Sequence, residues 1–151
     1  MKIFVPSRFS VIRVLRDDGH SKTFLGTDHL LERADVVVKI CRKGHFGRDR
    51  DYLIERLSWF SGIRHDNLTT IVDAGLTTRG DLYCVREYLP VSELFSTESS
   101  IAINALVSTI HFLQSHRRIH GAIKPSNIFV NNNILKLTDP NLNHMESTES
   151  Q

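Results

Sequence analysis

The stretch HGAIKPSNIFV, from His120 to Val130, combines a histidine, a lysine–proline pair and an asparagine with an apolar run that follows at once. A second apolar run, Ile134 to Leu137, comes after three consecutive asparagines, Asn131–Asn133. Two short apolar runs on either side of residues that tolerate positive φ are typical of a β-hairpin. The segment therefore predicts a polar loop that leads directly into a hairpin.

A helix is predicted just upstream, from Ile101 to Ser115. Its apolar side chains recur at helical spacing on one stripe, at Ala102, Leu106, Ile110 and Leu113. The polar stretch Ser96 to Ser100 precedes this helix as a connector. The chain changes character here, because the first 89 residues follow a different pattern.

Residues 1–89 are dominated by strand-like runs with β-branched side chains. The runs between Phe9 and Ile40 predict strands, and so do Leu68 to Asp73 and Leu82 to Leu89. One stretch, Asp51 to Gly62, has helical spacing and ends on a glycine, which favours a helix stop. This part of the chain is predicted to be a mostly antiparallel sheet with one helix.

The composition is that of a globular protein. The 151 residues include 19 basic and 17 acidic side chains, for a net charge of +2, so nothing in the charge indicates a nucleic-acid partner. No run approaches the roughly 20 apolar residues that span a bilayer, so we expect no membrane partner. Cys41 and Cys84 lie in apolar runs and are expected to be buried thiols, which suits a cytoplasmic location. Residues 143–151 are expected to form a disordered polar tail.

Three segments follow one another in an informative order. Val36-Val37-Val38-Lys39 ends a predicted strand, the stretch from His120 to Val130 follows a predicted helix, and Leu137-Thr138-Asp139-Pro140-Asn141 places an aspartate twelve residues after Asn127. Together they resemble the motifs of the protein kinase superfamily, whose members have the eukaryotic-like Ser/Thr kinase fold. The resemblance is to a degenerate and C-terminally truncated member.

The resemblance implies a protein-kinase-like α+β fold over residues 1–142. An N-lobe, residues 1–89, would hold the antiparallel β-sheet and one helix. Residues 90–142 would supply the first helix and the catalytic-loop hairpin of an incomplete helical C-lobe.

The resemblance also implies catalytic roles. In the family pattern H-R-D-L-x-x-x-N, the Asp accepts the proton of the substrate hydroxyl. Ala122 stands at that place, and a methyl group cannot accept a proton. By the same correspondence Lys124 would contact the transferring phosphate, and Asn127 and Asp139 would hold Mg²⁺.

The nucleotide-binding residues implied by the resemblance are Lys39, Gly19, Glu55, Glu87 and Leu89. Lys39 would reach the α- and β-phosphates of ATP and pair with a glutamate of the following helix. Glu87 and Leu89 would belong to the strand end whose backbone groups meet adenine.

The identity of the helix acid is open. Ungapped counting back from His65-Asp66-Asn67 arrives at Arg56, and an adjustment of one residue gives Glu55. Arg86 stands where the family gates the rear of the adenine pocket. It would either fill part of the adenine space or pair with an acid from the helix.

The expected glycine-rich loop departs from the family. Its three glycine positions hold Arg16, Asp18 and Ser21, although Gly19 lies among them. Glycines let backbone amides approach phosphates closely, and side chains interfere. Asp18 would also bring a negative charge towards the triphosphate.

These features favour a pseudokinase-like regulatory or scaffold module in signalling, with ATP and Mg²⁺ bound weakly or not at all. The alternatives are a weakly active ATP-dependent Ser/Thr protein kinase and a fragment of a larger kinase-domain regulator. The apolar stripe of the Ile101–Ser115 helix would be covered by the missing part of the C-lobe, a second copy or a different protein partner.

Overall fold

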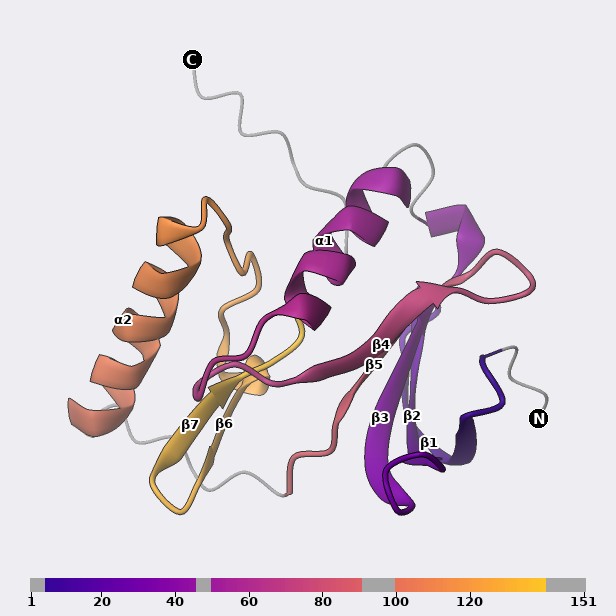
Figure 1. Cartoon of the computed structure of the whole chain (residues 1–151), viewed down its shortest axis with the longest axis horizontal. Helices are drawn as coiled ribbons and strands as arrows, with labels where there is room; N and C mark the ends of the chain where they lie inside the picture. The colour runs from indigo at the N-terminus through magenta and orange to yellow at the C-terminus, as the bar shows by residue number, and fades with distance from the viewer. Residues whose placement is uncertain (1–4, 46–49, 91–99, 141–151) are drawn as a thin grey trace. The chain divides into compact units, whose positions relative to one another are not determined.

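The computed structural model describes residues 5–45, 50–90 and 100–140 (Figure 1). The chain divides into two compact units. The described part of the first unit comprises residues 5–45, 50–62 and 71–88, and that of the second comprises residues 63–70, 89–90 and 100–140. The predicted disordered tail, residues 143–151, and most of the predicted polar connector lie outside the described residues.

The first unit is built on a five-stranded sheet whose neighbouring strands are all antiparallel. Its strands are β1 (Phe9–Asp17), β2 (Ser21–Asp28), β3 (Ala34–Cys41), β4 (Ile71–Leu76) and β5 (Leu82–Glu87). They lie in the order β1-β2-β3-β5-β4. The predicted antiparallel sheet is thereby confirmed.

One face of this sheet carries a cluster of buried side chains, drawn from alternate positions of the strands because successive residues point to opposite faces. Its members are Phe9, Phe24, Val36, Val38, Tyr83 and Val85. Cys41 and Cys84 are also buried as thiols, as predicted.

In the described part of this unit, the α-helix α1 (Arg50–Gly62) packs against β4 (Figure 1). Leu53, Leu57 and Phe60 are buried at the i, i+4 and i+7 positions, the spacing that puts side chains on one helical face. A short 3₁₀ helix, η1 (Lys43–His45), follows β3.

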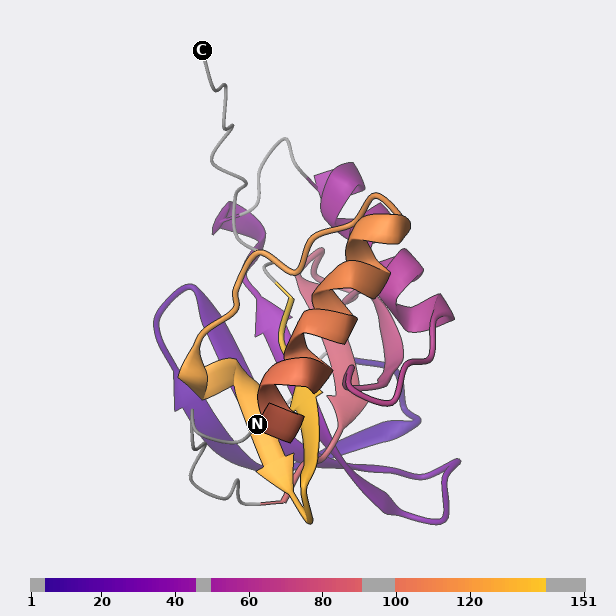
Figure 2. The same cartoon turned by 90° about the vertical axis from the view of Figure 1, so that its left-hand side faces the viewer.

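The second unit contains α2 (Ser100–Ser115), a 3₁₀ turn η3 (Pro125–Asn127), and the hairpin of β6 (Ile128–Asn131) and β7 (Ile134–Leu137). Asn132 and Asn133 both have positive φ, 49° and 62°, as a two-residue hairpin turn requires. α2 packs against β7, and the two lie side by side in Figures 1 and 2. The predicted helix and hairpin are both confirmed.

The predicted strand from Leu68 to Asp73 was misplaced, because β4 begins only at Ile71. The backbone before it pairs elsewhere. Thr69 N–H donates to the Leu137 carbonyl at 3.1 Å, and Leu137 N–H donates to the Asn67 carbonyl at 2.8 Å. These bonds to β7 place residues 67–69 in the second unit.

Among the residues that the structure describes, no helix combines the length and the apolar character needed to cross a membrane.

Candidate functional site

His120 anchors the loop that precedes the hairpin. It is buried, and its Nε2 lies 2.9 Å from the carbonyl oxygen of Thr138. Its Nδ1 accepts a hydrogen bond from the backbone N–H of Ala122 at 3.2 Å. A ring that donates through Nε2 and accepts through Nδ1 is the neutral tautomer with its proton on Nε2. The histidine therefore ties the loop to the segment after β7.

Asn127 closes the loop from its other end. The side chain is buried, and its Nδ2 donates to the Ala122 carbonyl at 2.8 Å. Thr138 N–H donates to the Asn127 carbonyl at 2.9 Å. Because Asp139 directly follows Thr138, these contacts bring the two predicted metal ligands, Asn127 and Asp139, to neighbouring places in the second unit.

The two predicted ligands offer oxygen donors. The remaining polar atom of the Asn127 carboxamide is Oδ1, and Asp139 is a half-buried carboxylate whose Oδ1 lies 3.5 Å from Thr138 Oγ1. Amide and carboxylate oxygens are the hard ligands that Mg²⁺ prefers, and Mg²⁺ usually needs only one or two carboxylates beside phosphates and water. The donor set therefore fits Mg²⁺. No group of three His, Cys, Asp or Glu able to hold a metal occurs within the described ranges.

The central position of the loop carries no acid. Ala122 is half-buried between His120 and Lys124. Its backbone N–H donates to the His120 ring, and its carbonyl accepts a hydrogen bond from the Asn127 side chain. Gly121 precedes it with a φ of 78°. Lys124 is exposed and extended, with φ −155° and ψ 158°. The loop therefore keeps its hydrogen-bonded scaffold around a methyl group.

Lys39 lies on β3 in the first unit, half-buried, with Thr23 opposite it on β2 and Cys84 opposite it on β5. On α1, Glu55 is exposed, whereas Arg56 is buried. The Arg56 guanidinium carbon lies 5.0 Å from the centroid of the Phe60 ring. Arg56, and not Glu55, therefore lies on the buried face of α1. The pairing of Lys39 with Glu55 stays a prediction.

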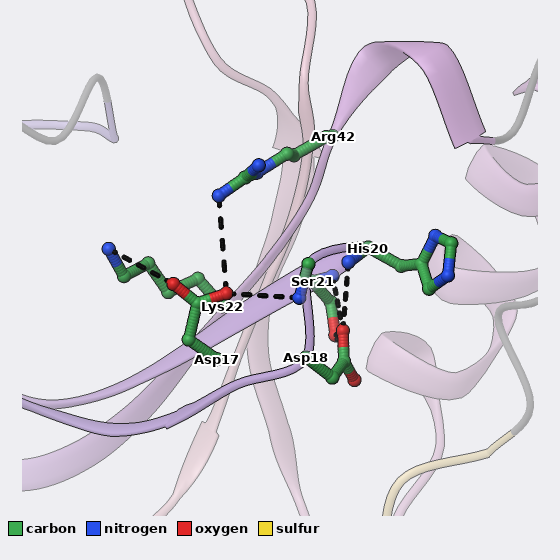
Figure 3. A network of polar contacts seen from close by, with 7 residues as sticks. Asp17, Asp18, His20, Ser21, Lys22 and Arg42 are labelled. Atoms are coloured by element: carbon green, nitrogen blue, oxygen red, sulfur yellow. Dashed lines mark hydrogen bonds and ion pairs between the residues drawn. The ribbon is translucent and has the colours of Figure 1, made fainter.

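The turn between β1 and β2 is closed by its own carboxylates (Figure 3). Gly19 N–H donates to Asp17 Oδ1 at 3.1 Å. The N–H groups of His20 and Ser21 both donate to Asp18 Oδ1, at 3.0 and 2.7 Å. Gly19 has a φ of 82°, which explains the glycine at this place. Three successive backbone amides of the predicted phosphate loop are thus already hydrogen-bonded to carboxylate oxygens.

These hydrogen bonds also stabilise the ionised carboxylates. The bond from the Gly19 amide lowers the pKa of Asp17, and the bond from the Ser21 amide lowers the pKa of Asp18. Asp17 also forms ion pairs with Lys22 at 3.4 Å and with Arg42 at 4.0 Å (Figure 3).

The charges of Asp18 and Lys39 both affect the pKa of the Cys41 thiol. Burial raises the pKa of the Cys41 thiol, the positive charge of Lys39 lowers it, and the negative charge of Asp18 raises it. Both charges therefore lie within electrostatic reach of the end of β3.

Arg86 lies on β5 opposite Val37 of β3, and it is half-buried. Its Nη1 donates to the backbone carbonyl of Glu87 at 3.2 Å. Glu87 is half-buried at the end of β5, and Leu89 is half-buried in the second unit. The Glu87 carbonyl is one of the backbone groups predicted to meet adenine, and both roles considered for Arg86 stay predictions.

Sequence reasoning identified Asp18 as an unfavourable charge but missed the capping of the turn, in which Asp17, Lys22 and Arg42 also take part. The pair Asp17-Asp18 followed by Gly19 was the available signal, because aspartate side chains readily accept hydrogen bonds from backbone amides two or three residues on.

Comparison with known proteins agrees with this arrangement. The sequence profile of the protein tyrosine and serine/threonine kinase family matches residues 18–151. The serine/threonine-protein kinase PrkC of Bacillus subtilis is 25% identical over 150 residues, which cover 89% of this chain and 22% of PrkC. The dual specificity protein kinase zak2 of Dictyostelium discoideum is 33% identical over 119 residues, which cover 72% of this chain and 17% of zak2. The chain spans less than a quarter of the length of these two relatives.

Proposed function

The chain belongs to the protein tyrosine and serine/threonine kinase family, and from that premise we propose that it is a pseudokinase-like regulatory or scaffold module in signalling. In this proposal it binds ATP weakly or not at all and does not carry out efficient phosphotransfer. The observation that carries the proposal is Ala122, a methyl group at the base position of a loop whose hydrogen bonds are otherwise intact.

The loss of the base has a known scale. Removing a general base typically costs ~10²–10⁴ in rate, or about 3–5.5 kcal/mol at roughly 1.36 kcal/mol per decade. Phosphoryl transfer depends mainly on positioning and electrostatics, so this loss alone would leave some activity. The capped turn and the Arg86–Glu87 contact would also weaken nucleotide binding, because they occupy backbone groups that are predicted to contact the phosphates and adenine.

The remaining residues could still hold a nucleotide. Lys39 would bind phosphate oxygens, the exposed ammonium of Lys124 would face a transferring phosphate, and Asn127 with Asp139 would hold Mg²⁺. When bound, Mg²⁺ would neutralise part of the phosphate charge. These groups support weak binding, because each of them retains the chemistry that its role requires.

The alternatives are a weakly active ATP-dependent Ser/Thr protein kinase and a fragment of a larger kinase-domain regulator, and an observation favours the second. The observation in its favour is coverage, since the chain matches 22% of PrkC and 17% of zak2. The whole activity of such a protein would then depend on segments other than residues 1–151.

We also propose that a protein partner or further C-lobe segments cover α2. Ala102 and Leu113 of the predicted stripe are already buried, but Ile103 and Val107, which widen the stripe, are 44% and 59% exposed and support this proposal. A cytoplasmic location is part of the proposal and rests on the two buried cysteines, which are present as thiols.

Thermal unfolding with and without millimolar Mg²⁺–ATP tests the nucleotide part of the proposal, with Lys39→Ala and Asp139→Ala as comparison variants. A ligand specific for the native state stabilises it by RT ln(1 + [L]/Kd), which is about 2.7 kcal/mol at a hundredfold excess over Kd. The proposal predicts a small shift or none. A large Mg²⁺-dependent rise in Tm that both variants abolish would contradict it.

A further inference from the structure

The β1–β2 turn presents its backbone amides to an anion that the chain itself supplies. Asp17 and Asp18 accept hydrogen bonds from the N–H groups of Gly19, His20 and Ser21, at 3.1, 3.0 and 2.7 Å (Figure 3). A run of successive backbone amides is the arrangement that proteins use to bind phosphate. In this turn each of these donors already has a carboxylate oxygen as its partner.

The capped turn is held at both flanks. Asp18 N–H donates to the Ser21 carbonyl at 3.2 Å, and Arg42 N–H donates to the His20 carbonyl at 3.1 Å. The side chain of Arg42 lies 4.0 Å from Asp17, which also pairs with Lys22 at 3.4 Å. The carboxylates are therefore placed by contacts from β2 and from the residue that follows β3.

A second hydrogen bond between a side chain and the backbone lies at the end of β5. The Arg86 guanidinium donates to the Glu87 carbonyl at 3.2 Å and so occupies a backbone acceptor. The two contacts are complementary in chemistry. Acidic side chains satisfy backbone donors at the turn, and a basic side chain satisfies a backbone acceptor at the strand end.

We propose that the first unit is autoinhibited at both ends of its nucleotide-binding surface. Asp17 and Asp18 take the place of phosphate oxygens at the β1–β2 turn, and Arg86 takes the place of the adenine amino group at the Glu87 carbonyl. This inference rests on the proposed function and deepens it, because it names the groups that exclude the nucleotide. A ligand must displace these side chains before it can use the same backbone groups.

The full chain can be tested with probes for each end separately. Tripolyphosphate reports on the turn and adenosine reports on the strand end, with affinities measured by titration calorimetry. The amide signals of Gly19, His20 and Ser21, followed by ¹⁵N–¹H NMR, give a direct readout at the turn.

Two double variants separate the charge of the turn from its hydrogen bonds. Asp17→Asn/Asp18→Asn removes the charges and keeps acceptor oxygens, whereas Asp17→Ala/Asp18→Ala removes both. The charge-matched control is Asp51→Asn/Asp66→Asn, since both of these aspartates are exposed. We expect tripolyphosphate to bind the Asn variant roughly tenfold more tightly than the natural sequence, the Ala variant more tightly again, and the control no more tightly.

At the strand end the variant is Arg86→Met, and its control is Arg79→Met at an exposed turn position. We expect Arg86→Met to raise the affinity for adenosine and not that for tripolyphosphate. The proposal is overturned if the natural sequence binds both probes as tightly as the variants do, with shifts at the three turn amides. Equal tripolyphosphate affinity in the Asn and Ala variants would also overturn it, because the amides would then not be occluded.

A failure of this inference is distinguishable from a failure of the proposed function. Phosphotransfer by the natural sequence would refute the proposed function, whatever the isolated probes show. Unchanged probe affinities in all variants would refute the autoinhibition alone and leave the absence of phosphotransfer standing. The NMR spectra report whether each variant keeps the fold of the first unit.

Discussion

The side-chain amide nitrogen of Asn127 lies 2.8 Å from the backbone carbonyl oxygen of Ala122. This bond joins a predicted metal ligand to the residue at the predicted position of the catalytic base. Together with the His120 contacts, it holds the loop in shape without help from the missing side chain. These hydrogen bonds hold the loop with an alanine at position 122.

Asn127→Ala should destabilise the second unit. The substitution removes a buried amide and leaves the Ala122 carbonyl without that donor, which typically costs about 1–3 kcal/mol. Urea unfolding, followed by the signals of the hairpin, measures the loss. The control is Asn104→Ala at an exposed position of α2, which should change little. Equal stability of the two variants would show that the bond does not hold the loop.

Arg56→Ala should cost more stability than Glu55→Ala. Arg56 is buried and lies over the Phe60 ring, so truncation removes both apolar packing of its stem and a cation–π contact, together about 1–2 kcal/mol. Glu55 is exposed, so we expect a change within about 0.5 kcal/mol. Chemical denaturation of the two variants gives the comparison. A larger loss for Glu55→Ala would favour Glu55 as the residue that packs towards the sheet.

Gly26→Ala should destabilise the sheet. A Cβ at Gly26 would lie 2.6 Å from the backbone carbonyl oxygen of Ser10, so the β1–β2 pair would have to shift. Such overpacking typically costs about 1–3 kcal/mol. Gly62→Ala is the matched control, because a Cβ there meets nothing within 4 Å. A Tm for Gly26→Ala at or above that of Gly62→Ala would contradict the close approach of the strands.

Part of the acid sensitivity of the first unit should come from Asp28. This buried carboxylate accepts hydrogen bonds from Arg8 Nε at 2.8 Å and Nη2 at 2.6 Å, which lower its pKa. A pKa that is lower in the folded state stabilises the protein above the unfolded value of about 3.9. That contribution is lost as the pH falls through the lower folded value.

Asp28→Asn should therefore cost about 3 kcal/mol at pH 7 and lose less stability than the natural sequence between about pH 5 and pH 2. Denaturant titrations at several pH values measure both effects. Asp66→Asn, at an exposed aspartate, is the control variant. A steep acid transition that persists unchanged in Asp28→Asn would assign the sensitivity to other groups.

Pattern alone located the regular elements well. Helical spacing predicted α1 and α2, and the Asn run between two apolar runs predicted the β6–β7 hairpin. It failed where distant pairing decides the structure, as at residues 67–69, whose backbone bonds to β7 rather than extending β4. Local sequence carries no signal for such a partner.

The candidate site shows the same division. The motifs predict roles for Ala122, Asn127 and Asp139, because these residues lie in one short segment with strong constraints on spacing. The turn caps and the Arg86–Glu87 contact depend on side-chain rotamers, and the choice between Glu55 and Arg56 depends on one residue of helix register. The spacing of residues in the sequence predicts neither the side-chain rotamers nor the exact register of a helix.

Whether the chain is a pseudokinase is decided by phosphate transfer from Mg²⁺–ATP, labelled at the γ-phosphate, to the chain itself and to a generic Ser/Thr substrate. Lys39→Ala and Asp139→Ala provide the background, because both remove groups that transfer would require. We expect the natural sequence to transfer no more label than either variant. Mg²⁺-dependent transfer by the natural sequence, lost in both variants, would contradict the proposed function and identify the chain as a catalyst that works without an acid at position 122.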